Sequence, residues 1–319
     1  FQKPSGCVWS VWALDKKKKK LSPLARFRGF IQAGATLLTN LHLPNFAKGA
    51  LYQGGGKYVC VPGLNCYSCP AASGACPIGS FQAVVGSSKF RFSYYITGFL
   101  ILLGVLLGRF ICGFLCPFGW FQELLHKIPT KKLSTKKLKP LTYLKYAVLL
   151  VMVVLLPAFL VNDVGMGDPF FCKYLCPQGV LEGAIPLSLA NSGIRAALGK
   201  LFTWKFSILL SVIVLSVVFY RPFCKWLCPL GAFYALLNKV SLFQMKVDQN
   251  KCVSCGKCAR ACKMDVDVTK SPNHTECIRC GMCIRACPTD AIRFRYGFGE
   301  GKDTEKTEKA VPAPQNNTQ

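Results

Sequence analysis

The stretches KCVSCGKCARACK, at residues 251–263, and ECIRCGMCIRACP, at residues 276–288, carry the same cysteine spacing, C-x2-C-x2-C-x3-C. Thiolates at this spacing can cover one face of a [4Fe–4S] cube, while the fourth thiolate of each run reaches the other cube. The repeat therefore predicts two clusters. Their expected ligands are Cys252, Cys255, Cys258 and Cys287 for one, and Cys277, Cys280, Cys283 and Cys262 for the other.

This pattern is typical of a two-cluster ferredoxin domain, which we expect at residues 247–298. The first run ends in Lys263, where the usual pattern has proline, but that position holds no ligand. Zinc sites show two separated cysteine pairs rather than two runs of four, and disulfides do not need this spacing. The spacing therefore favours iron–sulfur clusters over both alternatives.

The composition points to a membrane rather than to nucleic acid. Of the 319 residues, 51% are hydrophobic and 19 are cysteines, which with the exception of Cys7 stand in short-spaced groups typical of metal ligation. The formal net charge is +26, which anionic clusters would reduce. Basic residues gather at residues 16–20 and 131–139, beside apolar runs and not interleaved with aromatic side chains. We therefore expect membrane lipid as a partner and no nucleic acid.

Four apolar stretches predict membrane-spanning helices, at residues 29–46, 93–112, 144–161 and 206–220. The first stretch is the weakest, because it contains Asn40, His42 and Pro44. The expected fold is thus an α-helical integral membrane bundle of about four spans in two pseudo-repeated halves. A C-terminal α+β two-cluster ferredoxin domain follows it.

The distribution of lysine and arginine predicts how the chain is oriented. Both are concentrated at residues 1–28, a basic arm, and in the loop at residues 127–145. Because basic loops stay on the cytoplasmic side, we expect both termini and the ferredoxin domain in the cytoplasm, with the protein in the cytoplasmic (inner) membrane. The membrane domain is expected at residues 29–246. A disordered tail is expected at residues 299–319, which are charged, contain proline and lack aromatic side chains.

A second cysteine repeat lies outside the ferredoxin domain. It reads CGFLCPFG at residues 112–119, CKYLCPQG at 172–179 and CKWLCPLG at 224–231, with a degenerate copy, ACPIG, at 75–79. Proline suits the first helical position, so each Cys-Pro is expected to open a helix whose free N–H groups point at the cysteine sulfurs. That positive end favours an anionic cluster. Three aligned copies favour ligation over cysteine as a small buried hydrophobe in a turn.

The predicted topology divides these cysteines between two further [4Fe–4S] clusters. An inner cluster, on the cytoplasmic side, would use Cys112, Cys116, Cys224 and Cys228. An outer cluster would use Cys69, Cys76, Cys172 and Cys176. Cys60 and Cys66 stay unassigned: they displace two outer ligands, help to hold a further cluster, or form a disulfide. The two outer segments, at residues 61–80 and 176–190, are apolar and contain several glycines. They are therefore predicted to be re-entrant segments, which enter the bilayer without crossing it, and to place the outer cluster within it.

Paired Cys-x3-Cys-Pro motifs on membrane helices, followed by a two-cluster ferredoxin domain, resemble the polyferredoxin-type membrane electron-transfer proteins. That family includes the quinol-oxidising membrane subunits of periplasmic nitrate reductases and the C-terminal part of nitrous-oxide-reduction regulators. The likeness covers residues 92–288 and implies [4Fe–4S] cofactors and a chain of redox partners. Those relatives have two such motifs, whereas this chain has three and a fragment, which favours an outward electron path over their quinol role.

The leading hypothesis is an electron conduit between a cytoplasmic donor and an extracytoplasmic flavoprotein or reductase, and the reverse direction fits equally. The alternative is a quinone-coupled dehydrogenase subunit, with Glu123, His126 and Glu182 as candidate proton carriers. A structural role at a helix N-terminus is the simpler interpretation of Glu123. An iron–sulfur redox sensor ranks last, because no effector domain is evident. No catalytic residue is predicted, so the chain is interpreted as an electron-transfer subunit of a redox complex.

Overall fold

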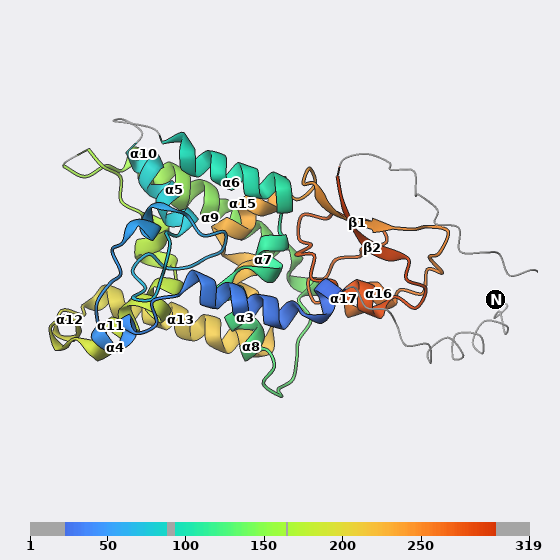
Figure 1. Ribbon diagram of the computed structural model, residues 1–319, viewed down its shortest axis with the longest axis horizontal. Coiled ribbons are helices and arrows are strands. Elements are labelled where there is room, and N and C mark those ends of the chain that lie inside the picture. Colours follow the sequence, from blue (N-terminus) through green and yellow to red (C-terminus); the bar gives the residue numbers. More distant parts are fainter. Residues whose placement is uncertain (1–22, 88–92, 164, 298–319) are drawn as a thin grey trace, which may run out of the picture.

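Figure 1 shows a computed structural model of the chain, an elongated molecule with a long helical body and a smaller domain at one end. It describes residues 23–87, 93–163 and 165–297. Most of the predicted basic arm, Cys7 and the predicted tail lie outside these described residues.

The body consists of helices of three kinds, joined by loops. The α-helices are α2 (Pro23–Arg26), α3 (Arg28–Thr39), α4 (Asn45–Lys48), α5 (Pro77–Gly86), α6 (Tyr94–Leu107), α7 (Phe110–Phe114), α8 (Pro117–Leu125), α9 (Leu144–Val148), α10 (Leu156–Phe159), α11 (Ile185–Ala190), α12 (Ser192–Ala196), α13 (Lys200–Val218), α14 (Pro222–Trp226) and α15 (Pro229–Leu237). The 3-10 helices are η2 (Gly55–Tyr58) and η3 (Lys136–Tyr143). The π-helices are η4 (Leu149–Leu155), η5 (Phe171–Leu175) and η6 (Gly179–Ala184).

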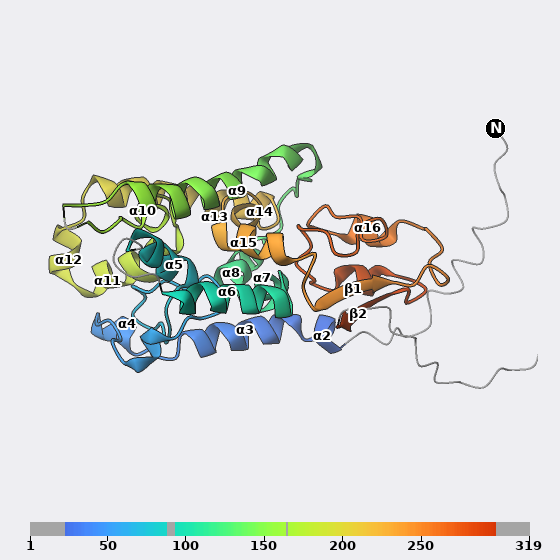
Figure 2. The same ribbon diagram turned by 90° about the horizontal axis from the view of Figure 1, so that it is seen from above.

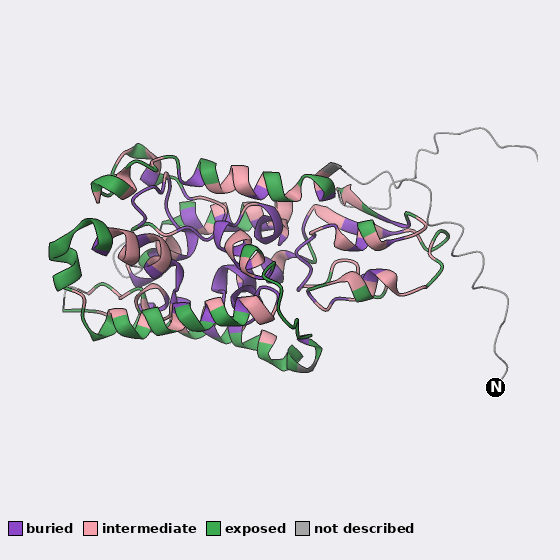
Figure 3. Ribbon diagram, turned by 90° about the horizontal axis from the view of Figure 1, so that it is seen from below, coloured by how far each residue is buried: buried purple, intermediate pink, exposed green. Residues whose placement is uncertain are grey.

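Within the described residues, two helices are long and apolar enough to cross a membrane. They run over Leu138–Phe159 and Lys200–Val218, which are 22 and 19 residues long. At 1.5 Å per residue they extend over about 33 and about 28 Å, close to the hydrocarbon thickness of about 30 Å. Only 22% and 17% of their most apolar windows are buried, and Figure 3 shows exposed residues along the outer helices. The core helix of a soluble protein would be mostly buried, so these apolar faces suit lipid.

The other two predicted spans are shorter than the sequence suggests. The stretch at residues 93–112 breaks into α6 and α7 at Gly108, whose positive φ of 55° does not continue a helix. The helix of 14 residues before the break extends over about 21 Å. The stretch at residues 29–46 contains the 12-residue helix α3, which ends before Asn40. Both predicted spans are therefore shortened, because their helices end at Thr39 and Leu107.

Pro157 lies inside the first long helix without ending it. The π-helix η4 directly precedes it, so the hydrogen-bond register has already shifted where proline offers no N–H. The helix therefore continues through α10, as the sequence predicts for a membrane helix.

The C-terminal domain has a two-stranded sheet and two short helices (Figure 2). Strands β1 (Phe243–Val247) and β2 (Ile292–Tyr296) are antiparallel, with Phe243 opposite Tyr296. Helices α16 (Lys257–Ala261) and α17 (Met282–Ala286) pack against each other. One apolar core runs from the body into this domain, because Met264, Val266 and Ile278 belong to the same buried cluster as the body's cysteines.

Candidate iron–sulfur sites

Two groups of four cysteines lie in the C-terminal domain. One cavity is lined by Cys252, Cys255, Cys258 and Cys287. A second is lined by Cys262, Cys277, Cys280 and Cys283. In each group three thiols come from one run and the fourth comes from the other, the crossing that the spacing predicts. The contact between α16 and α17 makes this exchange possible.

Both runs bend the backbone in the same way. Ser254 and Arg279, each just before the second cysteine of its run, have φ of 51° and 52°. Gly256 and Gly281, just after that cysteine, have φ of 67° and 75°. Residues in the left-handed conformation turn successive backbone N–H groups into a concave nest that favours an anion. Residues other than glycine rarely adopt this backbone conformation without strain. The repeated strain therefore fits loops shaped around anionic clusters.

The Cys-Pro motifs open helices, as the sequence predicts. Cys76, Cys116 and Cys228 are the N-cap residues of α5, α8 and α15, each followed by proline. The backbone N–H of Gly231 donates a hydrogen bond to Cys228 Sγ at 3.3 Å. After Cys176 the chain instead enters the π-helix η6. The free N–H groups at these helix starts face the thiols and favour negative charge there.

The inner site gathers thiols from four helices of the body. Cys112 lies on α7 and Cys224 on α14, while Cys116 and Cys228 cap α8 and α15. All four are buried, and Cys228 lies within electrostatic range of the other three. The structure thus brings together the four thiols that the topology assigns to one inner cluster.

Two glutamines of the first half, which the cysteine motifs do not indicate, each orient a thiol of the second half, one at the outer site and one at the inner site. Gln122 Nε2 donates to Cys224 Sγ at 3.1 Å, and Gln82 Nε2 donates to Cys172 Sγ at 3.2 Å. Each glutamine also accepts a hydrogen bond from the backbone N–H of the residue before that cysteine. Both stand six residues after a Cys-Pro cysteine, in CPIGSFQ and CPFGWFQ. This repeated glutamine is the signal that could have identified them.

An outer cavity of about 660 Å³ is lined by Cys66, Cys76, Cys172 and Cys176. Gly79 and Gly179 also line it, and a methyl group there would lie 3.8 Å from Cys172 Sγ and 3.6 Å from Cys66 Sγ. Pockets of several hundred Å³ are the size that holds cofactors. The two glycines keep space free beside the sulfurs, so this cavity fits a bound cluster.

Cys66 lines this cavity, where the sequence predicts Cys69. Cys69 is buried in a small apolar cluster against which Cys66 also packs, and its thiol donates a hydrogen bond to Asn40 Oδ1 at 3.6 Å. The backbone N–H of Cys66 donates to Glu182 Oε2 at 3.0 Å, which holds the loop beside the cavity. Cys60 and Cys66 are both free thiols, so no disulfide joins them.

Two buried arginines cross between the halves at the inner site. Arg109 and Arg221 each stand three residues before a C-x3-C motif, and neither is exposed to solvent. Arg109 Nη2 donates to the Cys224 carbonyl oxygen at 3.5 Å, and Arg221 Nη1 donates to that of Cys112. Each half thus places a guanidinium group beside the other half's thiols. The shared R-x-x-C pattern is the sequence signal for this pair.

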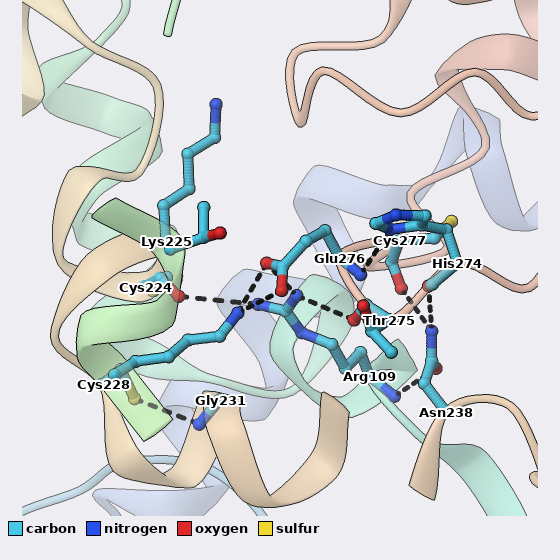
Figure 4. Close-up of polar contacts among 12 residues, drawn as sticks. Arg109, Cys224, Lys225, Cys228, Gly231, Asn238, His274, Thr275, Glu276 and Cys277 are labelled. Carbon is cyan, nitrogen blue, oxygen red and sulfur yellow. Dashed lines mark hydrogen bonds and ion pairs between the residues drawn. The ribbon is translucent and has the colours of Figure 1, made fainter. Parts of the chain in front are cut away.

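Glu276 docks the C-terminal domain onto the body (Figure 4). It directly precedes Cys277, and its carboxylate lies 2.8 Å from Arg109 and 2.5 Å from Lys145. Burial alone would raise the pKa of Glu276, but the charges of Arg109 and Lys145 lower it to about 2. The carboxylate is therefore ionised at neutral pH. Its stabilising effect is lost only as the pH falls from the ordinary value of 4.5 towards 2.

Glu123 plays the matching part for the other arginine. Its Oε1 lies 2.9 Å from Arg221 Nε, and it also pairs with Arg28. Glu276 faces Arg109 and Lys145, and Glu123 faces Arg28 and Arg221. In each group two cations face one carboxylate, which leaves one positive charge uncompensated. Arg221 Nη2 is buried and has no hydrogen-bond partner among the described residues. Uncompensated buried charge is costly, and an anionic cluster would balance this surplus and accept that hydrogen bond.

Arg279 and Asn238 fasten the second ferredoxin site to the body. Arg279 Nη2 donates to the Asn238 carbonyl oxygen at 2.7 Å and to Ser241 Oγ at 2.6 Å. Asn238 Nδ2 donates to the carbonyl oxygens of His274, at 2.7 Å, and Cys277, at 3.1 Å (Figure 4). The loop that carries this site is thereby fixed against α15.

A close backbone contact joins the inner site to that ferredoxin site. Gly113 follows Cys112, and a methyl group there would lie 2.4 Å from the carbonyl oxygen of Ile278, which follows Cys277. Only glycine permits this approach without displacing one backbone. The segment that carries Cys112 is therefore in direct backbone contact with the segment that carries Cys277.

The candidate proton carriers make structural contacts. Glu123 lies between two arginines, as described above. His126 Nδ1 lies 3.3 Å from the carbonyl oxygen of Ser216, and Glu182 accepts the hydrogen bond from Cys66. Each side chain thus has a role that requires no proton transfer.

Comparison with known families gives matches over both cysteine repeats. A family described as "4Fe-4S binding domain" matches residues 74–95, 92–136, 145–185 and 201–248, one segment for each Cys-Pro motif, including the degenerate copy. A second family of the same description matches residues 245–266 and 271–293, which hold the two ferredoxin runs.

Several known proteins are similar to this chain in sequence. An uncharacterized protein of Methanocaldococcus jannaschii is 32% identical over 209 residues, covering 62% of this chain and 77% of that relative. The regulatory protein NosR of Pseudomonas aeruginosa is 27% identical over 168 residues, 50% of this chain and 21% of NosR. The ferredoxin-type protein NapH of Haemophilus influenzae is 28% identical over 150 residues, 34% of this chain and 52% of NapH. No solved structure matches this chain.

These matches define an iron–sulfur electron-transport protein. The chain belongs to the family of polyferredoxin-type electron-transport proteins, as its motifs predict. The matches cover less than two thirds of NosR and of NapH, so the activities of those whole proteins are not carried over.

Replacing Cys66 with alanine should remove one cluster, because Cys66 and not Cys69 lines the outer cavity. We expect Cys66→Ala to lose about a quarter of the bound iron and sulfide, and Cys69→Ala to retain all of it. Chemical analysis of the purified variants measures this. The opposite pattern, with iron lost only in Cys69→Ala, would contradict the assignment.

Replacing Gly113 with alanine should loosen the docked domain, because the new methyl group would overlap the Ile278 carbonyl. Gly98→Ala is the matched control, since Gly98 also lies in a helix and a methyl group there meets nothing within 4 Å. Both changes add helix propensity of about 1 kcal/mol. We expect faster hydrogen exchange at residues 274–282 in Gly113→Ala alone. Equal exchange in both variants would show that the contact is unimportant.

Proposed function

We propose that this protein is a membrane electron conduit between a cytoplasmic donor and an extracytoplasmic redox partner. Bound [4Fe–4S] clusters would each accept and release one electron at a time. The part of this chain is to hold four of them in a row. Two ligand sets are the crossed groups of the ferredoxin domain, and a third is the inner group. The fourth is the outer group, with Cys66, Cys76, Cys172 and Cys176 as ligands.

The contact between Gly113 and Ile278 is the observation that carries the proposal. A hydrocarbon core of about 30 Å is too wide for one efficient electron transfer. Direct contact between the segments that hold the inner and ferredoxin thiols shortens one step. Three inner thiols (Cys112, Cys116 and Cys228) and three outer thiols (Cys76, Cys172 and Cys176) belong to or pack against one buried apolar cluster, which supports a second short step.

The charge around the first ferredoxin site indicates the chemistry of the cytoplasmic partner. Lys251 and Arg293 have side-chain exposures of 58% and 50%, and both lie near Asp248, at 3.7 Å and 3.6 Å. Arg260 and Lys270 belong to the same small domain. We therefore propose a negatively charged electron donor there, because complementary charge speeds association.

The membrane arrangement follows from the same physics. We propose a multi-pass protein of the inner membrane, with the ferredoxin domain in the cytoplasm beside the basic loop at residues 127–145. The outer cavity would then open towards an extracytoplasmic flavoprotein or reductase. The potentials of the two partners decide in which direction electrons flow.

A quinone-coupled dehydrogenase subunit is the second candidate, favoured by one cavity. This cavity, of about 360 Å³, is lined by Trp120, Glu123, His126, Tyr220 and Cys280, among others. It therefore places aromatic and ionisable side chains beside a ferredoxin-site cysteine. The ion pairs of Glu123 argue against its use as a proton carrier, so this candidate ranks second.

Counting clusters tests the conduit directly. We expect iron and sulfide analysis with EPR to find four [4Fe–4S] clusters in the purified protein. Two clusters would leave only the ferredoxin domain and would end the proposal.

Sealed vesicles separate the two candidates. We expect reduction of the cytoplasmic clusters to reduce a membrane-impermeant acceptor on the opposite face without quinone, and Cys172→Ala to abolish this transfer. Strict dependence on quinone, with Cys172→Ala unaffected, would favour the quinone-coupled subunit instead.

A further inference from the structure

The loop at residues 63–66 lies deep in the body. Leu64 is 1% exposed and Asn65 is not exposed, although neither belongs to a helix or strand. Buried loops are uncommon, because their backbone N–H and C=O groups must find partners away from water. The partners of this loop therefore indicate what it does.

Neighbouring positions of the loop lie against two different candidate sites. On the inner side, Gly63 lies directly against the backbone of Leu115 and Cys116. On the outer side, Leu64, Asn65 and Cys66 line the cavity together with Cys76. Neighbouring residues are about 3.8 Å apart along the chain. The loop thus passes from contact with the inner Cys-Pro motif to the lining of the outer cavity within one residue.

We infer that residues 63–66 are the bridge that couples the outer and inner iron–sulfur sites for electron transfer. This inference rests on the proposed function. One electron would leave the reduced site and arrive at the oxidised one, with no bond made or broken. Its path between the sulfurs would be the Leu64–Asn65 segment rather than a gap filled by side chains or lipid.

Gly63 sets how closely the bridge approaches the inner site. A methyl group at this position would lie 2.8 Å from Cys116 Cα and 2.9 Å from the Leu115 carbonyl oxygen. Both are backbone atoms, so they cannot move aside as a flexible side chain would. Any larger residue must push the loop away from the Cys-Pro motif that holds Cys116.

Further contacts fix both ends of the bridge. Tyr234 is fully buried, and its hydroxyl group donates to the Pro62 carbonyl oxygen at 3.1 Å. The backbone N–H of Val61 donates to the Ala75 carbonyl oxygen at 3.0 Å, next to Cys76. At the far end, Cys66 lines the outer cavity itself. The loop is thereby held against both sites at once.

Gly63→Ala is the test, with Gly55→Ala as its matched control, because Gly55 is the first residue of the 3-10 helix η2 and a methyl group there meets nothing within 4 Å. We expect Gly63→Ala to keep its iron but to slow arrival of electrons at the outer site about tenfold, equivalent to about 1.4 kcal/mol in the barrier. The EPR splitting between the two reduced sites should also shrink. Gly55→Ala should match the wild type in all three measurements.

Full iron content with unchanged splitting and rate in Gly63→Ala would overturn the bridge. If Gly63→Ala loses iron, Tyr234→Phe decides, since it keeps the ring and removes only the hydrogen bond to Pro62. We then expect a smaller slowing at full iron content, and an unchanged rate would again reject the bridge. A wild-type protein whose outer site never becomes reduced would instead reject the conduit.

Discussion

Close approach of backbone segments that carry thiols is the constraint on which this structure depends. Electron transfer between cofactors needs short distances, and side chains between the segments would lengthen them. At two places glycine permits the approach: Gly63 lies against Cys116, and Gly113 lies against Ile278. In both cases the neighbouring atoms belong to the backbone. Larger residues there would separate the sites and not merely shift a side chain.

The buried charges follow from what such sites must hold. Thiolate-bound clusters are anionic, and a low-dielectric interior makes uncompensated charge expensive. Arg109 and Arg221 bring positive charge to the inner site from opposite halves, and each is oriented by a carboxylate. Glu276 performs two tasks with one side chain. It orients Arg109, and because it directly precedes Cys277, it also attaches the C-terminal domain where the inner site lies.

The two halves of the body repeat the Cys-Pro motifs, but the first copy departs from the pattern. Gln82 at the outer site and Gln122 at the inner site, both in the first half, make the same pair of hydrogen bonds to segments of the second half. The degenerate first motif, however, has alanine four residues before Cys76. In our proposal Cys66 supplies the fourth thiol from a loop, because it lines the outer cavity, and the same loop lies against the inner site. The departure from the repeat thus coincides with the segment that we infer to be the bridge.

Local spacing was sufficient for much of this protein. The C-x2-C-x2-C-x3-C runs predict which thiols meet across the ferredoxin domain, and Cys-Pro predicts helix starts, because both depend on residues a few positions apart. The family followed from the same motifs. Spacing could not show that Cys66 rather than Cys69 lines the outer cavity, because that cavity is closed by segments more than a hundred residues away, such as the one that carries Cys172 and Cys176. Nor could it show that the apolar stretch at 93–112 breaks at Gly108, or that two arginines cross between halves. Those features come from packing between distant segments, where one carbonyl or one carboxylate determines which of several similar residues lies in the site.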